Sequence, residues 1–240
     1  MKYKDKNVTI GEVVVEVPEV TEVFKEFRID FCCGGHRNLA SVIEEQKIDG
    51  AALFERLDKL YENRKASYEN KESQFDQMSP QVLVTYIEDT HHEYLRRVLP
   101  ETAGLLTTIL RVHGKNHQEL FDMYRIYGQL KADLEQHLLK EETMLFPDFN
   151  EIDNNEQEII DLTKMIMSEH EAAGELLEKL RTISGNYHLP EDACKTFAKT
   201  YQLLEDIEDD LHQHIHLENN ILLKNYRKRE TLFKSNEILN

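Results

Sequence analysis

Two stretches of this chain share one pattern, in which a His is followed four residues later by a Glu. The stretches are QHLLKEETMLFP, residues 136–147, and QHIHLENNILL, residues 213–223. Leu or Ile recurs at helical spacing behind each pair, so the imidazole and the carboxylate share one face of an amphipathic helix. The pairs are His137 with Glu141 and His214 with Glu218. Two such pairs on facing helices can hold two metal ions inside a helical bundle.

Two further histidines stand at nearly the same distance upstream of these pairs. His92 precedes His137 by 45 residues, and His170 precedes His214 by 44. A helix with one His followed by a helix with a His-Glu pair therefore occurs twice, which indicates two helical hairpins related by pseudo-twofold symmetry. Burying this many titratable groups in one core is costly unless something compensates them. We therefore predict a two-metal site rather than ordinary core histidines or chance spacing on polar surface helices.

The residue types in this set narrow the choice of metal. Imidazole with carboxylate and no thiolate favours iron, manganese or zinc, and disfavours magnesium and calcium, which prefer oxygen ligands. Two bridging Glu with two His per ion leave each metal short of a full octahedral set. We therefore expect an oxo or hydroxo bridge and an open position, where a small molecule can bind or from which an ion can leave.

Composition supports a helical protein and excludes several partners. Of 240 residues, 31% are charged and 40% hydrophobic, with only nine Gly and five Pro, a balance typical of a largely helical fold. The formal net charge of -17 disfavours nucleic acid and anionic membranes as partners. No apolar run approaches the roughly 20 residues of a transmembrane helix, and the first residues lack the apolar core of a secretory signal. We expect a cytoplasmic protein.

The positions of Pro, Gly and polar stretches, which interrupt the helical patterns, suggest an all-α chain in four parts. Residues 1–65 form a small helical domain with a vicinal Cys pair, 66–79 a polar linker, 80–227 an antiparallel four-helix bundle and 228–240 a tail. Within the first part, residues 9–17 are expected to be extended or irregular, with a helix opening near Pro18. Pro100 is expected to kink or break the first bundle helix.

The vicinal cysteines, Cys32 and Cys33, precede two glycines. We expect them to be exposed on a Gly-rich turn. Adjacent cysteines form a disulfide only in a strained ring, so a role in metal binding, thiol exchange or nitrosylation is favoured. The alternative is that both are small buried hydrophobic residues. The third cysteine, Cys194, lies near a helix start among apolar residues and is expected to be structural.

The remaining candidates near the metal residues are assigned outside the ligand set. His91, His212 and His216 should point to other faces of their helices, at the surface or behind the ligands. Glu142 faces about 100° away from Glu141 on a helix and is expected to be solvated. Solvated positions in turns or at helix ends are expected for the other histidines, which are His36, His113, His117 and His188.

These motifs resemble those of the repair of iron centres (RIC) family, the di-iron proteins of iron-sulfur cluster repair, over nearly the whole chain. The matching segments, in the order of the family, are IDFCCGGHRNL, HEYLRRVLP, HLLKEETMLFP, SEHEAAGELL and HIHLENNILL. The resemblance implies a hemerythrin-like four-helix bundle with two non-haem iron ions bridged by carboxylates. The implied metal ligands are His92, His137, Glu141, His170, His214 and Glu218. Cys32 and Cys33 match the N-terminal thiols of the family.

The resemblance also implies a function. Such a protein repairs iron-sulfur clusters damaged by nitric oxide or peroxide, by donating iron to client proteins, and redox activity or homodimer formation is left open. The rival hypotheses are a hemerythrin-type protein that binds or senses dioxygen or nitric oxide, and a nitric oxide reductase activity at the di-iron centre. Oxygen-carrying hemerythrins usually have a second His four residues after the one on the third helix, where this chain has Gly174. That difference favours iron donation over carriage.

Overall fold

The computed structural model describes residues 2–66, 75, 77–149 and 156–224. Within these residues the regular elements are helices, and the extended pairing consists of one isolated bridge between Thr9 and Asn38. The predicted all-α fold class is confirmed. Most of the predicted linker, the predicted tail and the last residues of the predicted bundle lie outside the described residues. No helix in the described ranges combines the length and apolarity needed to span a membrane.

The chain divides into two compact units that are described separately. One unit is built from Met1–Leu83 together with Ile215–Asn240, and the other is Val84–His214. The last long helix therefore contributes its body to one unit and its C-terminal end to the other.

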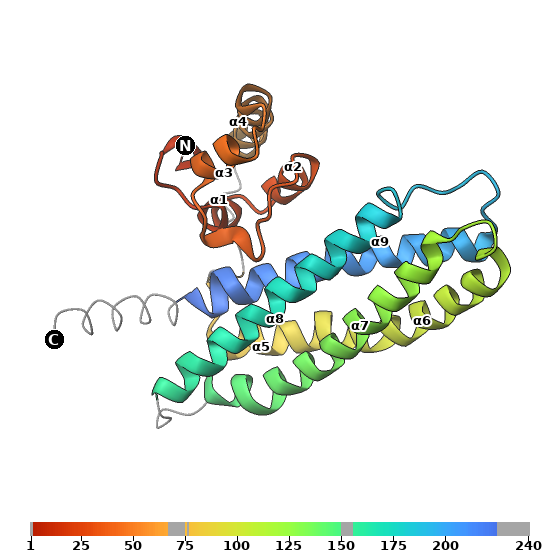
Figure 1. Cartoon of the computed structure of the whole chain (residues 1–240). Helices are drawn as coiled ribbons and strands as arrows, with labels where there is room; N and C mark the ends of the chain where they lie inside the picture. Colours follow the sequence, from red (N-terminus) through yellow and green to blue (C-terminus); the bar gives the residue numbers. More distant parts are fainter. Residues whose placement is uncertain (1, 67–74, 76, 150–155, 225–240) are drawn as a thin grey trace. The chain divides into compact units, whose positions relative to one another are not determined.

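The second unit is the antiparallel four-helix bundle predicted from the sequence (Figure 1). Its long helices are α6 (Glu93–His113), α7 (Glu119–Lys140), α8 (Glu156–Ile183) and α9 (Lys195–His216). The short helix α5 (Pro80–Ile87) leads into α6 through a π-helical turn, η3 (Glu88–His92). After α7 the chain continues through a second π-helical turn, η4 (Glu141–Leu145), and a 3-10 turn, η5 (Phe146–Phe149).

Pro100 was predicted to kink or break the first bundle helix, and the break does not occur. Helix α6 continues through it. Near this point the hydroxyl of Tyr127, on α7, donates a hydrogen bond of 3.0 Å to the carbonyl of Leu99. Tyr127 and Leu99 are both buried, so this bond and the surrounding apolar packing hold α6 against α7 at the proline.

The bundle core is one contiguous set of aliphatic and aromatic side chains from all four helices. Its fully buried members include Leu95, Leu99, Leu106, Leu120, Tyr127, Leu130 and Phe197. Fully burying one such side chain stabilises the fold by about 1.5–3 kcal/mol. This packing supports the polar groups in the bundle interior.

After a 3-10 turn, η1 (Lys2–Lys4), the first unit continues with a helix where an extended or irregular segment was predicted. Helix α1 (Ile10–Glu16) is held by a capping box, in which Thr9 and Glu12 bond each other's backbone N–H groups. The cap fixes the first helical turn, and Val13 and Val14 are buried, so this segment is helical rather than extended or irregular. Helix α2 (Val20–Glu26) follows, near Pro18 as predicted.

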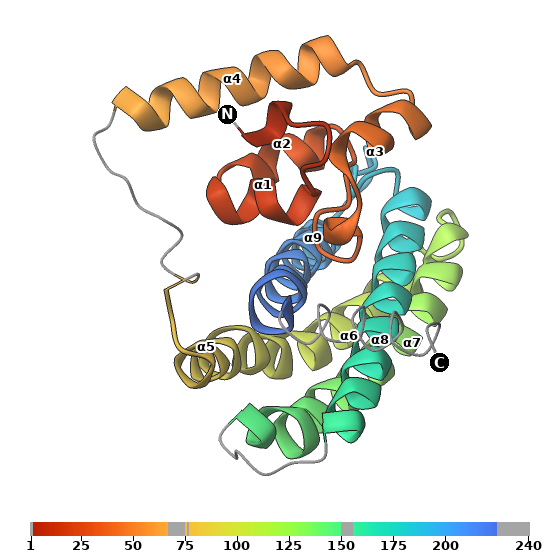
Figure 2. The same cartoon turned by 90° about the vertical axis from the view of Figure 1, so that its left-hand side faces the viewer.

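The remainder of the N-terminal region completes a small helical domain. A 3-10 turn, η2 (Gly34–His36), leads to α3 (Leu39–Glu45), whose N-cap is Asn38 as predicted. Helix α4 (Gly50–Ala66) begins after Asp49, which caps it, and lies against α2 (Figure 2). The apolar core of this unit includes Phe24, Leu53 and Leu57, and also Ile215 from the C-terminal part of the unit.

That C-terminal part includes η6 (Leu217–Leu222), a third π-helical turn, which directly continues α9. Two consecutive Asn side chains of η6 bind the backbone in front of the glycine pair. Asn219 Nδ2 donates to the carbonyl of Cys32 at 3.2 Å, and Asn220 Nδ2 donates to that of Phe31 at 3.0 Å. The Cys-Cys-Gly-Gly loop is therefore fixed onto η6 by buried hydrogen bonds.

Candidate metal centre

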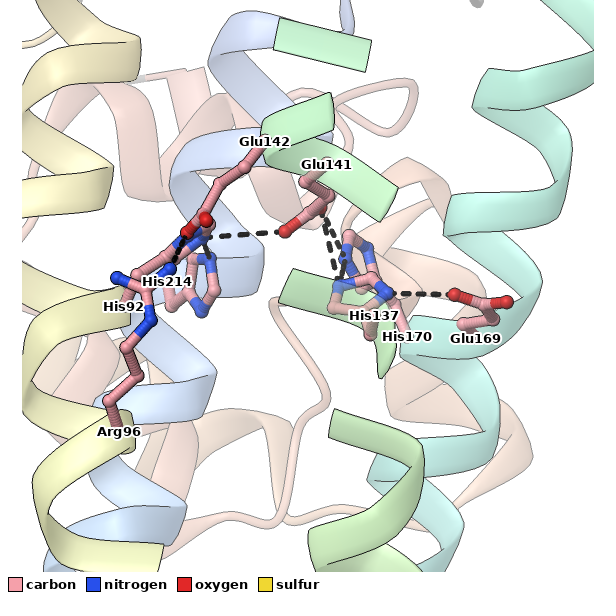
Figure 3. A network of polar contacts seen from close by, with 8 residues as sticks. All are labelled: His92, Arg96, His137, Glu141, Glu142, Glu169, His170 and His214. Atoms are coloured by element: carbon pink, nitrogen blue, oxygen red, sulfur yellow. Dashed lines mark hydrogen bonds and ion pairs between the residues drawn. The ribbon is translucent and has the colours of Figure 1, made fainter. Parts of the chain in front are cut away.

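The carboxylate of Glu141 lies among imidazoles in the bundle interior, and its two oxygens face different histidines (Figure 3). Oε1 is 3.3 Å from Nε2 of His137 and 3.7 Å from Nε2 of His170. Oε2 is 3.4 Å from Nε2 of His92. A carboxylate placed in this way could be shared between two ions.

The histidines form two pairs whose ring nitrogens face each other. Nε2 of His92 and Nε2 of His214 are 3.2 Å apart, and Nε2 of His137 and Nε2 of His170 are 3.0 Å apart. Two adjacent ligands at about 2.1 Å from one ion are separated by about 3 Å. Each pair, with the nearer oxygen of Glu141, therefore has the spacing of a partial ligand set, and the donor atoms in each set lie within 4.8 Å of one another.

The buried carboxylate of Glu141 is the strongest indication that this site binds metal ions. Glu141 is fully buried, and neither of its oxygens accepts a hydrogen bond from the described part of the chain. A buried, ionised carboxylate without hydrogen bonds is costly unless positive charge compensates it. Burial by itself raises the pKa of Glu141, but the neighbouring His137 outweighs it and holds that pKa well below its usual range. Glu141 is thus a buried anion, and metal ions would supply the missing charge.

The same environment shifts the pKa of His137 upward, opposite to the shift of Glu141. Burial lowers its pKa, but the charge of Glu141 outweighs this effect, and the pKa of His137 rises to about 9. Without a metal, the ring therefore carries a proton that a bound ion would replace.

Two carboxylates that the sequence analysis did not place in the site orient the ligand rings. Nδ1 of His92 lies 2.7 Å from Oε1 of Glu142, and Nδ1 of His137 lies 2.9 Å from Oε2 of Glu169. Metal-binding histidines commonly donate their second ring N–H to such a group, which leaves Nε2 free to bind the ion. Glu142 was expected to be solvated, and that prediction was wrong.

A cation completes each of these contacts. Arg96 forms an ion pair with Glu142, and Lys140 forms one with Glu169. The site therefore has two similar arms, each a histidine, a carboxylate and a cation. The sequence hardly distinguishes Glu142 and Glu169, because many Glu residues flank the candidate ligands. The only indication is the rule that each metal-binding ring needs a partner for its second nitrogen.

His91 lies behind a candidate ligand, which is one of the two positions predicted for it. It is buried, and its ring stacks on that of His214 with centroids 5.3 Å apart and planes within 2°. Its Nδ1 lies 2.9 Å from Oδ1 of Asp210. His216 is likewise buried rather than exposed, in the first unit, where its ring packs edge-on against Phe31.

Three of the four ligand-bearing helices widen into π turns at the candidate ligands. His91 and His92 end η3, Glu141 begins η4, and Glu218 lies in η6. A π turn adds a residue to a helical turn and is frequent at functional sites. It changes which faces neighbouring residues occupy, so adjacent positions such as His91 and His92 are both buried here.

Glu218, the second predicted bridging residue, is buried in η6. It follows His214 by four residues along the continuing helix and belongs to the first unit, because the division of the chain falls after His214. Its assignment as a ligand stays a prediction.

The vicinal thiols are not exposed, which corrects the sequence prediction. Cys32 and Cys33 are buried and reduced, with their sulfurs 3.6 Å apart. Asp30 accepts hydrogen bonds from the backbone N–H groups of Cys32, Cys33 and Gly34, and so folds the loop around its carboxylate. The hydrogen bond with Cys33 and burial raise the pKa of Cys32 well above its usual value, so its thiolate is disfavoured in this conformation.

Comparison with known families agrees with both parts of this description. Residues 83–226 match the family described as "Hemerythrin HHE cation binding domain", and residues 6–61 match a "Domain of Unknown function (DUF542)". The iron-sulfur cluster repair protein YtfE of Musicola paradisiaca is 31% identical over 92% of this chain and 96% of its own length. This chain belongs to the iron-sulfur cluster repair proteins. The resemblance stated from the sequence motifs is confirmed.

Other members of the repair family match over a similar span. The iron-sulfur cluster repair protein ScdA of Staphylococcus haemolyticus is 27% identical over 90% of this chain and 96% of its own length. A probable iron-sulfur cluster repair protein of Haemophilus influenzae is 31% identical over 89% of this chain and 93% of its own length. The relatives therefore share both the N-terminal region and the bundle with this chain.

Proposed function

We propose that this chain repairs damaged iron-sulfur clusters by delivering iron from a two-iron centre in its bundle. The observation that carries this proposal is the placement of two imidazole pairs on either side of the buried Glu141 carboxylate. The membership of the chain in the repair family supports cluster repair as the use of this iron. The clients are proteins that contain iron-sulfur clusters.

The donor set fits iron. His92 and His214 would hold one ion, His137 and His170 the other, with Glu141 between them. We assign Glu218 as the second shared carboxylate because it is buried and repeats the His-Glu spacing of His137 and Glu141. Imidazole and carboxylate oxygen suit ferrous and ferric ions. Bound iron would supply both the redox chemistry of the site and the cargo for repair.

The residues around the centre favour an ion that can leave. Gly174 lies one helical turn after His170 on α8 and carries no side-chain donor. The ion between His137 and His170 therefore lacks a ligand that hemerythrin-type carriers place there, and a less complete ligand set holds iron less tightly. Glu142 and Glu169 still fix the rings, so the apo site keeps its geometry for reloading.

We propose that Cys32 and Cys33 take part in delivery. Because both are buried, this role requires the loop held by Asp30 to open first. The exposed Cys194 offers a matched control, since it is a free thiol outside that loop.

The experiment that tests the function is anaerobic iron transfer. The iron-loaded protein is mixed with a ferredoxin or an aconitase whose cluster has been damaged with nitric oxide, and client activity and iron content are followed. We expect recovery with the native chain and with Cys194→Ser, none with His137→Ala, and slower recovery with the Cys32→Ser, Cys33→Ser double variant. Absence of recovery with the native chain, together with reversible dioxygen binding, would instead favour a carrier or sensor.

Normal recovery with the double variant would exclude the thiols from delivery while leaving the repair function in place.

A further inference from the structure

A second group of metal-ligand residues gathers at one end of the bundle, with no shared residue with the centre around Glu141. His113 ends α6 and His117 lies in the turn that follows, while Asp192 and Cys194 precede α9. Cys194 was predicted to be structural, but it is exposed. Its position at the surface, in contact with His113, calls for another explanation.

Three of these residues, His113, His117 and Asp192, are close enough to share one ion, and the fourth, Cys194, contacts His113. Nε2 of His117 is 2.9 Å from Oδ1 of Asp192, and Nε2 of His113 is 3.3 Å from Sγ of Cys194. The donor atoms of His113, His117 and Asp192 all lie within 4.8 Å of one another. In a tetrahedral zinc site, ligands at 2.0–2.3 Å from the ion are separated by roughly 3.3–3.6 Å. Binding by all four residues would therefore require the side chain of Cys194 to move toward His117 and Asp192, and both Cys194 and Asp192 are exposed.

The two rings are already oriented as ligands. Nδ1 of His117 lies 2.9 Å from Oε1 of Glu119, so the ring can give its second N–H to a carboxylate and present Nε2 to the other donors. This is the support that metal-binding histidines usually have. Both rings also pack edge-on against the fully buried Phe197, with centroids 5.3 Å away for His113 and 5.5 Å away for His117.

The sulfur lies in surroundings that favour its anionic form. Hydrogen bonds from the backbone of Phe197, and then the contact with His113, lower the pKa of Cys194 to about 7. Thiolate is the form of cysteine that binds metals.

An ion-pair reading accounts for only part of this arrangement. A protonated His117 would bond Glu119 and Asp192 at once, and the hydrogen bond to Glu119 does raise the pKa of His117. That reading leaves the contact between His113 and Cys194 unexplained. A bound cation would account for both contacts.

We propose that His113, His117, Asp192 and Cys194 form a zinc site that joins the turn after α6 to the segment before α9. Two imidazoles, a thiolate and a carboxylate in a tetrahedral arrangement suit Zn²⁺ better than the all-oxygen cations. The ion would link the ends of two helical hairpins that are far apart in sequence. Because the donors are at or near the surface, zinc can enter and leave without disturbing the bundle interior.

The test is a titration of the iron-loaded full chain with Zn²⁺, with metal content measured for both elements after desalting. We expect about one zinc per chain with the iron retained, and an affinity at least about 10-fold lower in Cys194→Ser and in His117→Ala. His188→Ala removes an exposed histidine from the same segment and should bind zinc like the native chain. Helical content by circular dichroism checks that each variant is folded.

Substitution with Co²⁺ gives a readout that depends on the sulfur. The native chain should show a thiolate-to-cobalt charge-transfer band. Among the tested variants, only Cys194→Ser should lose this band while Co²⁺ is still bound. Two results would overturn the proposal. One is no zinc uptake above that of the His117→Ala, Cys194→Ser double variant, and the other is zinc uptake matched by an equal loss of iron.

Discussion

Oε1 of Glu142 lies 2.7 Å from Nδ1 of His92, and this contact determines which ring nitrogen of His92 faces Glu141. A carboxylate accepts the N–H of Nδ1, so Nε2 is left with its lone pair directed into the site. Arg96 balances the charge of Glu142. On the other side of the site, Glu169 contacts Nδ1 of His137, and Lys140 balances the charge of Glu169.

Removing this contact should weaken metal binding without removing a ligand. We expect Glu142→Ala to lower the iron affinity by about 10-fold to 100-fold, the range found for partners of ligand histidines. Glu142→Gln should be milder, because its amide oxygen can still accept the bond. The measurement is iron retention against a competing chelator. Glu93→Gln is the matched control, because Glu93 also pairs with Arg96 but at 4.0 Å and with a largely exposed side chain. Equal retention in all four proteins would contradict the proposed role.

Loss of the Glu141 carboxylate should change the number of iron ions bound per chain, which the Glu142 variants should affect less. We expect Glu141→Ala to bind about one iron ion fewer per chain, because the two imidazole pairs lose the anion placed between them. Glu171→Ala, an exposed position next to His170, should keep the native iron content. Iron per chain is measured after anaerobic loading and desalting. An unchanged iron content in Glu141→Ala would show that Glu141 is not a ligand.

The sequence predicted the bundle because helical periodicity and the repeated His-Glu spacing are local signals. The same spacing named five residues that the bundle brings together, His92, His137, Glu141, His170 and His214. It could not separate Glu142 and Glu169 from the many solvated Glu residues, because their role depends on π turns and on neighbouring helices. Helix α1 was predicted as extended or irregular because the capping box of Thr9 and Glu12, which starts the helix, was not recognised.

Burial of the cysteines was the other failure, and it had a different cause. A Gly pair indicates a turn, and turns are usually exposed. Here Gly35 instead permits close approach of Asn220 from η6, a contact between segments that are far apart in the sequence, and Gly34 lies against Asp30. No local pattern reports such a contact. The side chain of Asp30 then turns the loop inward by binding three consecutive N–H groups.

This close approach makes Gly35 sensitive to a single methyl group. A Cβ at Gly35 would lie 2.5 Å from Oδ1 of Asn220, whose amide is held by Phe31 and His216. We expect Gly35→Ala to destabilise the protein by about 1–3 kcal/mol. Denaturant unfolding measures the change. The double variant Gly35→Ala, Asn220→Gly should lose less stability than the two single changes added together, because the clash is then absent. Additive losses would mean that Asn220 is not the obstacle.

Gly104 provides the comparison, since a Cβ there meets no atom of the described chain within 4 Å. Gly104→Ala lies within α6 and should leave stability unchanged or raise it by up to about 1 kcal/mol, because Ala favours helix more than Gly does. A loss in Gly104→Ala equal to that in Gly35→Ala would point to a general effect of the substitution.

The exposed thiol of Cys194 should react with an alkylating reagent before the buried thiols do. Cys194 is exposed and its pKa is lowered to about 7, so at neutral pH a large fraction of it is thiolate. Cys32 is buried, and its hydrogen bond with Cys33 raises its pKa. We expect iodoacetamide to modify Cys194 at least about 10-fold faster than Cys32, as followed by mass spectrometry of peptides. In denaturant the three rates should converge. Faster labelling of Cys32 or Cys33 in the native protein would mean that the loop around Asp30 is open in solution, and delivery of iron through these thiols would then need no opening step.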